Sequence, residues 1–309
     1  MSARVACLFP AFAMRYREFR RDHVEGCMDV VLPLLERAEA VVAIDREKFE
    51  SPDAVVLPDE FNDALQGQYA CYIDNCAAAE ILRDRYANCH CVAGYSMGLF
   101  SALYFCGVTS FEEGLLLTRD ICRLAYDAVP QGDYGMGAVS GLTVEEVRRV
   151  MLQAESQTEV SDICGKRQVI VSGLRSDVKE VLDACMSYGA MNAKLLPVSL
   201  PFHSSLLHSA EPHLRDLLQP IKLRAPRVPI ISAITQQVLA TGENVREELA
   251  RNVSHPMNWY ATMQKLLELG VNQMYECGLS ESLTNLANRN VRGRYTIHHV
   301  KQPKEFVPT

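Results

Sequence analysis

The sequence predicts an α/β fold in which a large domain with a parallel sheet carries a smaller inserted domain. Short apolar runs that end at turn residues alternate with longer segments of helical periodicity, which is the pattern of a parallel α/β sheet. Residues 135–197 depart from it, because they read strand, helix, strand, strand, helix, strand, the order of a ferredoxin-like unit. A chain of 309 residues is also longer than a usual single domain. We therefore assign residues 1–134 and 198–309 to the large domain and residues 135–197 to the small one.

The first part of the large domain is expected to alternate buried strands with helices. The apolar run at 5–9 ends at Pro10 and predicts a first strand. Residues 27–40 have helical spacing, and the stretch 62–85, rich in Ala, Cys, Ile and Leu, predicts one or two buried helices. Ser110 opens a capping box at the start of a further helix, whose apolar stripe includes Ile121.

The small domain and the segment after it contain the remaining predicted elements. A second capping box at Thr143 opens the first helix of the small domain. In this domain we expect strands at 136–140, 159–163, 168–172 and 194–198, with helices at 143–154 and 176–187. After it we expect strands at 228–235, 271–277 and 295–300, with helices at 247–252, 257–270 and 279–290.

Composition and charge exclude several classes of protein. With 48% hydrophobic and 22% charged residues the composition is globular, and a net charge of −7 gives no reason to expect a nucleic-acid partner. The eleven cysteines fall inside apolar segments and the chain opens without a signal-peptide pattern, so we expect reduced thiols in a cytoplasmic protein. No apolar run reaches membrane-spanning length, so no membrane partner is expected. Cys89, His90 and Cys91 lack a second pair at zinc-finger spacing, so we expect no metal site.

The most informative stretch, residues 91–105, combines a strand end, a tight turn and an apolar helix. The turn has the form Gly-x-Ser-x-Gly, with Gly94 and Gly98 on either side of Ser96. A serine on a sharp strand-to-helix turn stands clear of the sheet, where a base can reach its hydroxyl. The helix expected from Met97 points free N–H groups and its positive dipole end at the space in front of Ser96. A negatively charged tetrahedral intermediate would be stabilised there.

A serine hydroxyl becomes a good nucleophile only when a neighbouring base takes its proton, and histidine suits neutral pH. His203 directly follows a predicted strand end, where loops meet active sites in open α/β sheets. In α/β-hydrolases the catalytic residues follow the chain order serine, then an acid, then histidine. With that order the base would instead be His298 or His299 near the C-terminus. The sequence pattern alone leaves both choices open.

Several motifs along the whole chain occur in the same order in one known family. They are Leu8-Phe9-Pro10, Gly94-Tyr95-Ser96-Met97-Gly98 with Ser101-Ala102-Leu103 and Gly107-Val108, Ala128-Val129-Pro130, Pro201-Phe202-His203-Ser204, His255-Pro256-Met257-Asn258-Trp259, and Tyr275-Glu276-Cys277-Gly278. On these residues the chain resembles the malonyl-CoA:acyl-carrier-protein transacylase family, which includes the acyltransferase domains of fatty-acid and polyketide synthases. The resemblance implies a large α/β-hydrolase-like domain with a ferredoxin-like insertion.

The resemblance also implies a Ser–His dyad without an acid. Ser96 would attack a thioester and become acylated, while His203 would act as general base and then as general acid. A backbone carbonyl, placed at Asn252, would orient the histidine. The oxyanion hole would consist of the backbone amides of Phe12 and Met97. No cofactor is implied, because the acyl group would arrive on the phosphopantetheine of an acyl carrier protein or on CoA.

The main departure from the family concerns the acyl pocket. Members that transfer malonyl groups carry an arginine on the second helix that pairs with the free carboxylate of the substrate, and the corresponding position here is Ile121. With Ile121 and Phe202 lining the pocket, a carboxylate would lose a charge-assisted bidentate pair and meet an apolar wall. Arg119 and Arg123 fall on the opposite helix face. We therefore expect acyl groups without a carboxylate.

These considerations leave several functions open. The first hypothesis is a hydrolase that clears simple acyl groups from carrier-protein thioesters, since members without the arginine resemble the stand-alone acyl hydrolases of trans-acyltransferase polyketide synthases. The second is an acyltransferase that moves a non-malonyl acyl group between CoA or carrier proteins. Less favoured are a malonyl transferase that uses another cation and a catalytically idle docking protein. We expect an acyl carrier protein as partner and a monomeric chain.

Overall fold

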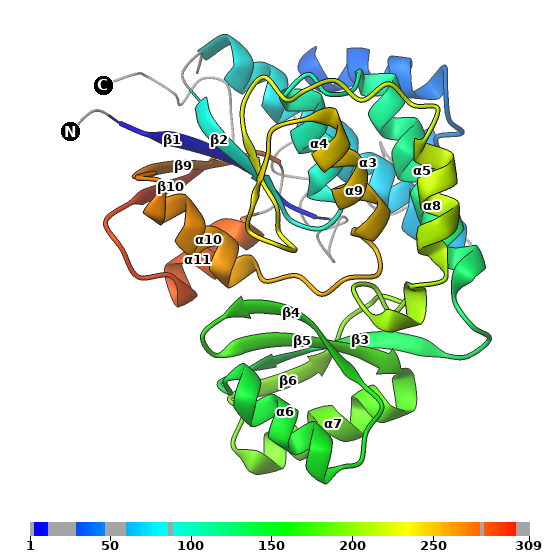
Figure 1. Cartoon of the computed structure of the whole chain (residues 1–309), viewed down its shortest axis with the longest axis vertical. Helices are drawn as coiled ribbons and strands as arrows, with labels where there is room; N and C mark the ends of the chain where they lie inside the picture. Colours follow the sequence, from blue (N-terminus) through cyan, green and yellow to red (C-terminus); the bar gives the residue numbers. More distant parts are fainter. Residues whose placement is uncertain (1–2, 12–28, 47–59, 86–88, 279–280, 301–309) are drawn as a thin grey trace.

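The computed structural model describes residues 3–11, 29–46, 60–85, 89–278 and 281–300 (Figure 1). It contains a mostly parallel sheet covered by helices, drawn in the upper part of Figure 1, and a separate antiparallel sheet below it, drawn in green. The predicted α/β class with a ferredoxin-like insertion is confirmed.

The large sheet has the strand order β10-β9-β1-β2-β7-β8, in which every pair is parallel except β7 with β8. Its strands are β1 (Val5–Phe9), β2 (Cys89–Gly94), β7 (Ile230–Ile231), β8 (Val238–Leu239), β9 (Gln273–Glu276) and β10 (Thr296–His299). All five residues of β1 are buried, because successive side chains of this central strand enter apolar cores on opposite faces of the sheet. The sheet therefore has two packed faces.

Helices cover both faces of this sheet (Figure 1). On one face lie α3 (Glu60–Arg85), α4 (Gly98–Phe105), α5 (Phe111–Ala128), α8 (Ala210–Leu218) and α9 (Gly242–Arg251). On the other face lie α10 (Trp259–Glu268) and α11 (Ser282–Asn290). None of the described helices is long and apolar enough to cross a membrane.

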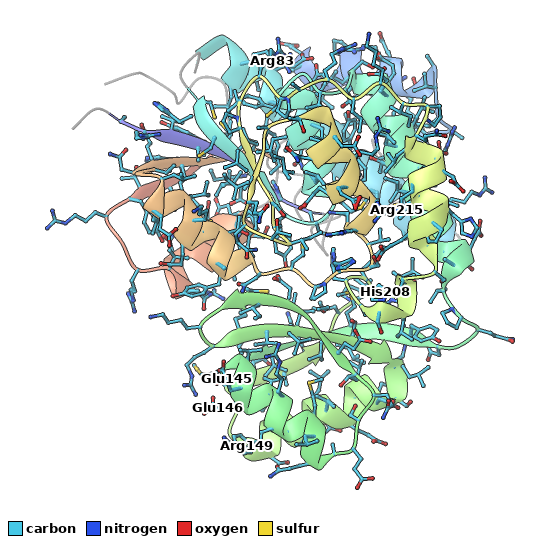
Figure 2. The ribbon with its side chains drawn as sticks, in the orientation of Figure 1. Arg83, Glu145, Glu146, Arg149, His208 and Arg215 are labelled. Carbon is cyan, nitrogen blue, oxygen red and sulfur yellow. The ribbon has the colours of Figure 1, made fainter. Side chains whose placement is uncertain are left out.

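The small sheet has the antiparallel order β4-β5-β3-β6. Its elements are β3 (Tyr134–Ser140), α6 (Val144–Gln153), β4 (Glu159–Gly165), β5 (Gln168–Leu174), α7 (Arg175–Tyr188) and β6 (Asn192–Leu195). Val169 and Val171 belong to the core that this sheet shares with α6 and α7, whereas Ile170 between them points to the opposite face. Figure 2 shows Glu145, Glu146 and Arg149 around α6, on the side remote from the large domain. The face of the small sheet that carries Ile170, opposite to the face packed on α6 and α7, is thus turned toward the large domain.

The structure differs from the sequence-based expectations in a few elements. Helix α8 was not predicted, because Pro212 interrupts its apolar pattern, but proline is tolerated in the first turn of a helix. Helix α9 begins five residues before the predicted start at 247, because the Thr241 side chain caps it by accepting a hydrogen bond from Asn244 N at 3.1 Å. Strand β6 ends at Leu195 rather than at 198, and only residues 230 and 231 of the strand expected at 228–235 pair as β7.

Candidate active site

The strand-to-helix turn after β2 holds Ser96 in a left-handed conformation with φ of +52°. The amide of Tyr95 donates to the Phe9 carbonyl at 2.9 Å and ties the turn to the neighbouring strand β1. The amides of Gly98 and Leu99 then bond back to Tyr95 and Ser96, so the chain turns at once into α4. A non-glycine residue with positive φ costs of order 1–3 kcal/mol and occurs mainly at functional sites. This sharp turn therefore lifts Ser96 out of the sheet.

The two glycines of the turn are required by close backbone contacts. A Cβ on Gly94 would collide with the backbone of Leu99, and a Cβ on Gly98 would collide with the Phe9 carbonyl. Both obstacles are backbone atoms, which cannot move aside as the end of a flexible side chain can. Glycines at these two positions thus let α4 start directly against β1 and β2.

His203 reaches Ser96 from a loop that is distant in sequence. Its Nε2 lies 2.8 Å from Ser96 Oγ, within hydrogen-bond distance. The backbone of His203 is also left-handed, with φ of +60°, and its amide donates to the Val253 carbonyl at 2.7 Å. The imidazole is almost completely buried, at 4% exposure. The loop conformation and this burial fix the ring beside the serine hydroxyl.

Burial also sets the charge of the histidine. Removal from water disfavours the imidazolium and lowers the pKa of His203 to about 4, against the opposing effect of the backbone carbonyls of His255 and then Asn252. The ring is therefore neutral at physiological pH and can accept a proton. Its buried Nδ1 has no hydrogen-bond partner of standard geometry among the described residues.

The region in front of Ser96 suits a developing negative charge. Helix α4 begins there, its N-cap residue Met97 makes no side-chain capping hydrogen bond, and no acidic residue lies in its first turn. Among the described residues, the amide of Met97 donates no backbone hydrogen bond of the turn, whose bonds come from the next three amides along the chain. Free amides at a helix N-terminus stabilise anions.

Ser96 and His203 open into a cavity of about 630 Å³ between the two sheets. This volume is typical of a small-molecule site. Most of the described lining side chains are apolar. The small sheet and the segment after it contribute apolar side chains that include Met136, Ala138, Ile170, Leu196 and Val198, and the small sheet also contributes the polar Asp162, Gln168 and Lys194. The strands of the small sheet reach the cavity with alternate residues, because their other face is packed on α6 and α7.

One buried carboxylate belongs to this cavity. Asp162 on β4 accepts hydrogen bonds from the Tyr95 hydroxyl at 2.6 Å, from the Cys164 thiol at 2.9 Å and from the Trp259 amide at 3.2 Å. Burial raises the pKa of Asp162, while these donors oppose the rise. Three donors converging on both oxygens is the pattern of an ionised carboxylate. Through Tyr95 and Trp259, Asp162 also links the small sheet to the large domain next to Ser96.

A family model for the acyl transferase domain matches residues 36–292. The chain belongs to this acyl transferase family. It is 31% identical to the malonyl CoA-acyl carrier protein transacylase of Escherichia coli K12 over 202 residues, which are 65% of this chain and 65% of the relative. The aligned segment thus spans slightly less than two thirds of that curated relative.

Solved structures are similar over nearly the whole chain. An acyl-carrier-protein S-malonyltransferase from Burkholderia pseudomallei 1710b is 27% identical with a TM-score of 0.86, covering 97% of both chains. A malonyl transacylase solved in complex with a type II polyketide synthase acyl-carrier protein is 25% identical with the same TM-score, covering 97% of this chain and 96% of that one. The fold of this acyl transferase family member is therefore that of its solved relatives.

Of the other site residues predicted for this acyl transferase family member, some line the cavity and others do not. Met97 and Phe202 line the cavity, whereas Phe12 lies outside the described residues. His298 and His299, the alternative bases, lie on the edge strand β10 and do not line the cavity. His299 Nε2 instead bonds the Gly278 carbonyl at 2.6 Å.

The structure bears differently on two further predicted positions, Ile121 and Asn252. Ile121 is fully buried in the apolar core under α5 and is not among the described residues that line the cavity, because the apolar stripe of α5 packs on neighbouring helices. The carbonyl assigned to Asn252 acts together with that of His255, which has the larger effect on the His203 pKa.

No local sequence signal indicates the Asp162 cluster, because two of its three donors, Tyr95 and Trp259, lie 67 and 97 residues away in the chain. The metal expectation also needs qualification. Within the part of the chain that the structure describes, one group of side chains has metal-ligating spacing, and it lies outside this cavity at His208, Glu211 and His255.

Proposed function

We propose that this protein is a serine-dependent acyl-thioester enzyme in which Ser96 is the nucleophile and His203 is its base. The observation that carries the proposal is the 2.8 Å contact between Ser96 Oγ and a buried, neutral His203 Nε2. A nucleophile within hydrogen-bond reach of a base, at the mouth of a cavity, is the arrangement of covalent acyl transfer.

In the first half-reaction, Ser96 Oγ attacks the thioester carbonyl carbon while its proton passes to His203 Nε2. The amide of Met97 and the N-terminus of α4 stabilise the oxyanion of the tetrahedral intermediate. When the C–S bond breaks, the imidazolium returns the proton to the leaving thiolate. The thiol departs and an acyl ester remains on Ser96.

In the second half-reaction, His203 activates either water or a second thiol to attack the acyl ester. Attack by water makes the protein a hydrolase, and attack by a thiol makes it an acyltransferase. We favour hydrolysis of non-carboxylated acyl groups from carrier-protein thioesters, a clearing activity of the kind needed in polyketide biosynthesis. No cofactor is required, because the acyl group arrives on the phosphopantetheine arm of a carrier protein or on CoA.

The charges around the cavity support the non-carboxylated acyl group. Asp162 contributes a buried carboxylate, whereas the cation Lys194 is exposed on the edge strand β6. No arginine lines the cavity among the residues that the structure describes. A malonyl carboxylate would meet a like charge and lose its hydration without a bidentate partner.

The alternative is an acyltransferase that moves a malonyl or another acyl group. The names of the relatives favour it, since the Escherichia coli protein and both solved structures are described as malonyl transferases. The same names support an acyl carrier protein as the partner, because one of those structures is a complex with a carrier protein.

The test uses the full chain with carrier protein loaded with acetyl, butyryl or malonyl groups, with and without a second empty carrier. We expect acetyl or butyryl on Ser96 by intact mass, none on Ser96→Ala, and release of free acid. Transfer of the acyl group to the second carrier would establish the acyltransferase instead. Preferred loading of malonyl would contradict the proposed acyl specificity, and no loading at all would contradict the proposed enzyme.

A further inference from the structure

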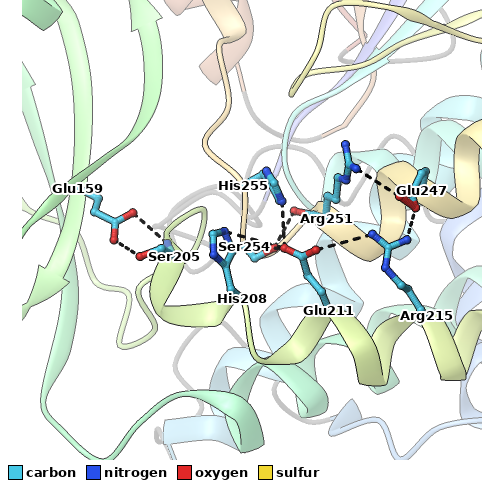
Figure 3. A network of polar contacts seen from close by, with 9 residues as sticks. All are labelled: Glu159, Ser205, His208, Glu211, Arg215, Glu247, Arg251, Ser254 and His255. Carbon is cyan, nitrogen blue, oxygen red and sulfur yellow. Dashed lines mark hydrogen bonds and ion pairs between the residues drawn. The ribbon is translucent and has the colours of Figure 1, made fainter.

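The His–Glu–His cluster is formed by side chains that the proposed mechanism does not use. His208 directly follows a short 3₁₀ helix, η1 (Ser205–Leu207), Glu211 lies in the first turn of α8, and His255 lies in the segment after α9 (Figure 3). One ligand atom from each of the three residues lies within 4.8 Å of the other two. Figure 2 places His208 at the level where the large domain meets the small one.

The three side chains face one another with nearly the spacing of a metal site. Glu211 Oε1 lies 3.0 Å from His255 Nε2 and 4.0 Å from His208 Nε2, and the two imidazole rings lie side by side with centroids 5.3 Å apart. Ligand atoms around a tetrahedral ion with bonds of 2.0–2.1 Å are separated by about 3.4 Å. The His208 side chain is 53% exposed, so its ring has space to turn toward the other two ligands.

The surroundings hold the glutamate in position. The Ser254 hydroxyl donates to Glu211 Oε1 at 2.8 Å, and Arg215 lies 3.8 Å from Glu211 Oε2 (Figure 3). Arg215 also forms an ion pair with Glu247, so its positive charge is shared between two carboxylates. Arg251 pairs with the same Glu247 at 3.4 Å. Contacts of this kind to a ligating carboxylate fix its orientation and are typical of the surroundings of metal ligands.

We propose that His208, Glu211 and His255 bind a divalent transition-metal ion, with Zn²⁺ as the best fit. Two imidazoles and one carboxylate suit zinc, and the exposed side of His208 leaves a further coordination position open to water. Metal ligation by His255 Nε2 requires that this atom carry no proton, so metal affinity at the cluster should depend on pH.

Metal binding at this cluster connects to the candidate active site through one segment, residues 253–255. His255 would provide a ligand with its side chain, and Val253, two residues earlier, accepts the backbone amide of His203 with its carbonyl at 2.7 Å. The ion would fix this segment to η1 and α8 and thereby change how fast Ser96 is acylated. The effect on acylation rests on the proposed function, whereas metal binding at the cluster does not.

The binding test titrates the chelator-treated full chain with Zn²⁺, and with Co²⁺ as a spectroscopic probe. We expect one equivalent to bind, visible absorption bands of nitrogen and oxygen ligation, and an affinity loss of about tenfold or more in His208→Gln and in Glu211→Gln. The matched control is His213→Gln, an exposed histidine of the same helix α8, which should bind like the wild type. Equal affinity of His208→Gln and the control, or a thiolate charge-transfer band from the cysteines, would overturn the site.

The coupling test measures single-turnover acylation of Ser96 with and without Zn²⁺. We expect the ion to change the rate in the wild type and in His213→Gln and to leave the rate of His208→Gln unchanged. A rate that ignores Zn²⁺ in all three proteins overturns the link to His203 while the binding result stands. Failure of the proposed function is distinct from both, because Ser96 would then not be acylated even though Co²⁺ binds.

Discussion

The burial of His203 makes a specific prediction about pH. Its pKa is lowered from 6.5 to about 4 by removal from water, which corresponds to about 3 kcal/mol against the charged form. The imidazole therefore stays neutral, and able to accept the Ser96 proton, down to pH values well below those at which a solvated histidine is protonated. We expect the single-turnover rate of Ser96 acylation to be level from pH 8 to about pH 5 and to fall with an apparent pKa near 4.

The assay is rapid mixing with an acetyl thioester, followed by intact-mass detection of acyl-Ser96 at each pH. Removal of the general base in His203→Gln should slow acylation by about 10²–10⁴-fold, and Ser96→Ala should show none. A wild-type rate that is half-maximal near pH 6.5 would refute the reasoning, since it would mean that the ring is hydrated. Unchanged acylation in His203→Gln would refute the role of the base.

The same pKa has a consequence for folding that can be isolated by comparison with His203→Gln. Between pH 6.5 and 4 the folded protein binds fewer protons at this ring than the unfolded chain does. The contribution of the neutral ring to the free energy of unfolding is therefore fully present above pH 6.5 and is lost as the pH falls toward 4. Relative to His203→Gln, the wild type should lose about 3 kcal/mol over this interval in urea unfolding. A difference that does not change with pH would contradict the lowered pKa.

Three further predictions concern the turn and the cavity. Gly98→Ala should lower the free energy of unfolding, measured in urea, by several kcal/mol, because the added Cβ would meet the Phe9 carbonyl. The control Gly189→Ala has φ of +114° but open space around it, and should cost only about 1 kcal/mol. Equal losses in the two variants would argue against the steric explanation. Tyr95→Phe removes one donor from the buried Asp162 and should cost about 1–3 kcal/mol by thermal or urea unfolding, and an unchanged stability would mean that this bond contributes nothing. Asp162→Asn removes the negative charge from the cavity wall and should raise malonyl over acetyl loading of Ser96 severalfold by intact mass, while an unchanged ratio would show that this carboxylate does not act on the acyl group.

Much of this protein follows from local sequence signals with a direct physical cause. Gly94 and Gly98 around Ser96 predict the sharp turn, because only glycine fits where α4 starts against two strands. Capping boxes predict the starts of α5 and α6, which the structure has at Ser110 and Thr143. The capping boxes depend on neighbours within a few residues, so the sequence alone determines them. The need for glycine at position 98 is visible in the motif, although the obstructing Phe9 carbonyl belongs to the distant strand β1.

Contacts between distant segments could be decided only by the tertiary structure. The sequence left His203, His298 and His299 as possible bases, and the fold brings only the first of these to Ser96, across 107 residues. It likewise packs Ile121 into the core instead of the cavity wall, since periodicity shows that a helix face is buried but not what it is buried against. The Asp162 donors and the His–Glu–His cluster arise in the same way, because side chains far apart along the chain meet only after the sheets and helices have packed.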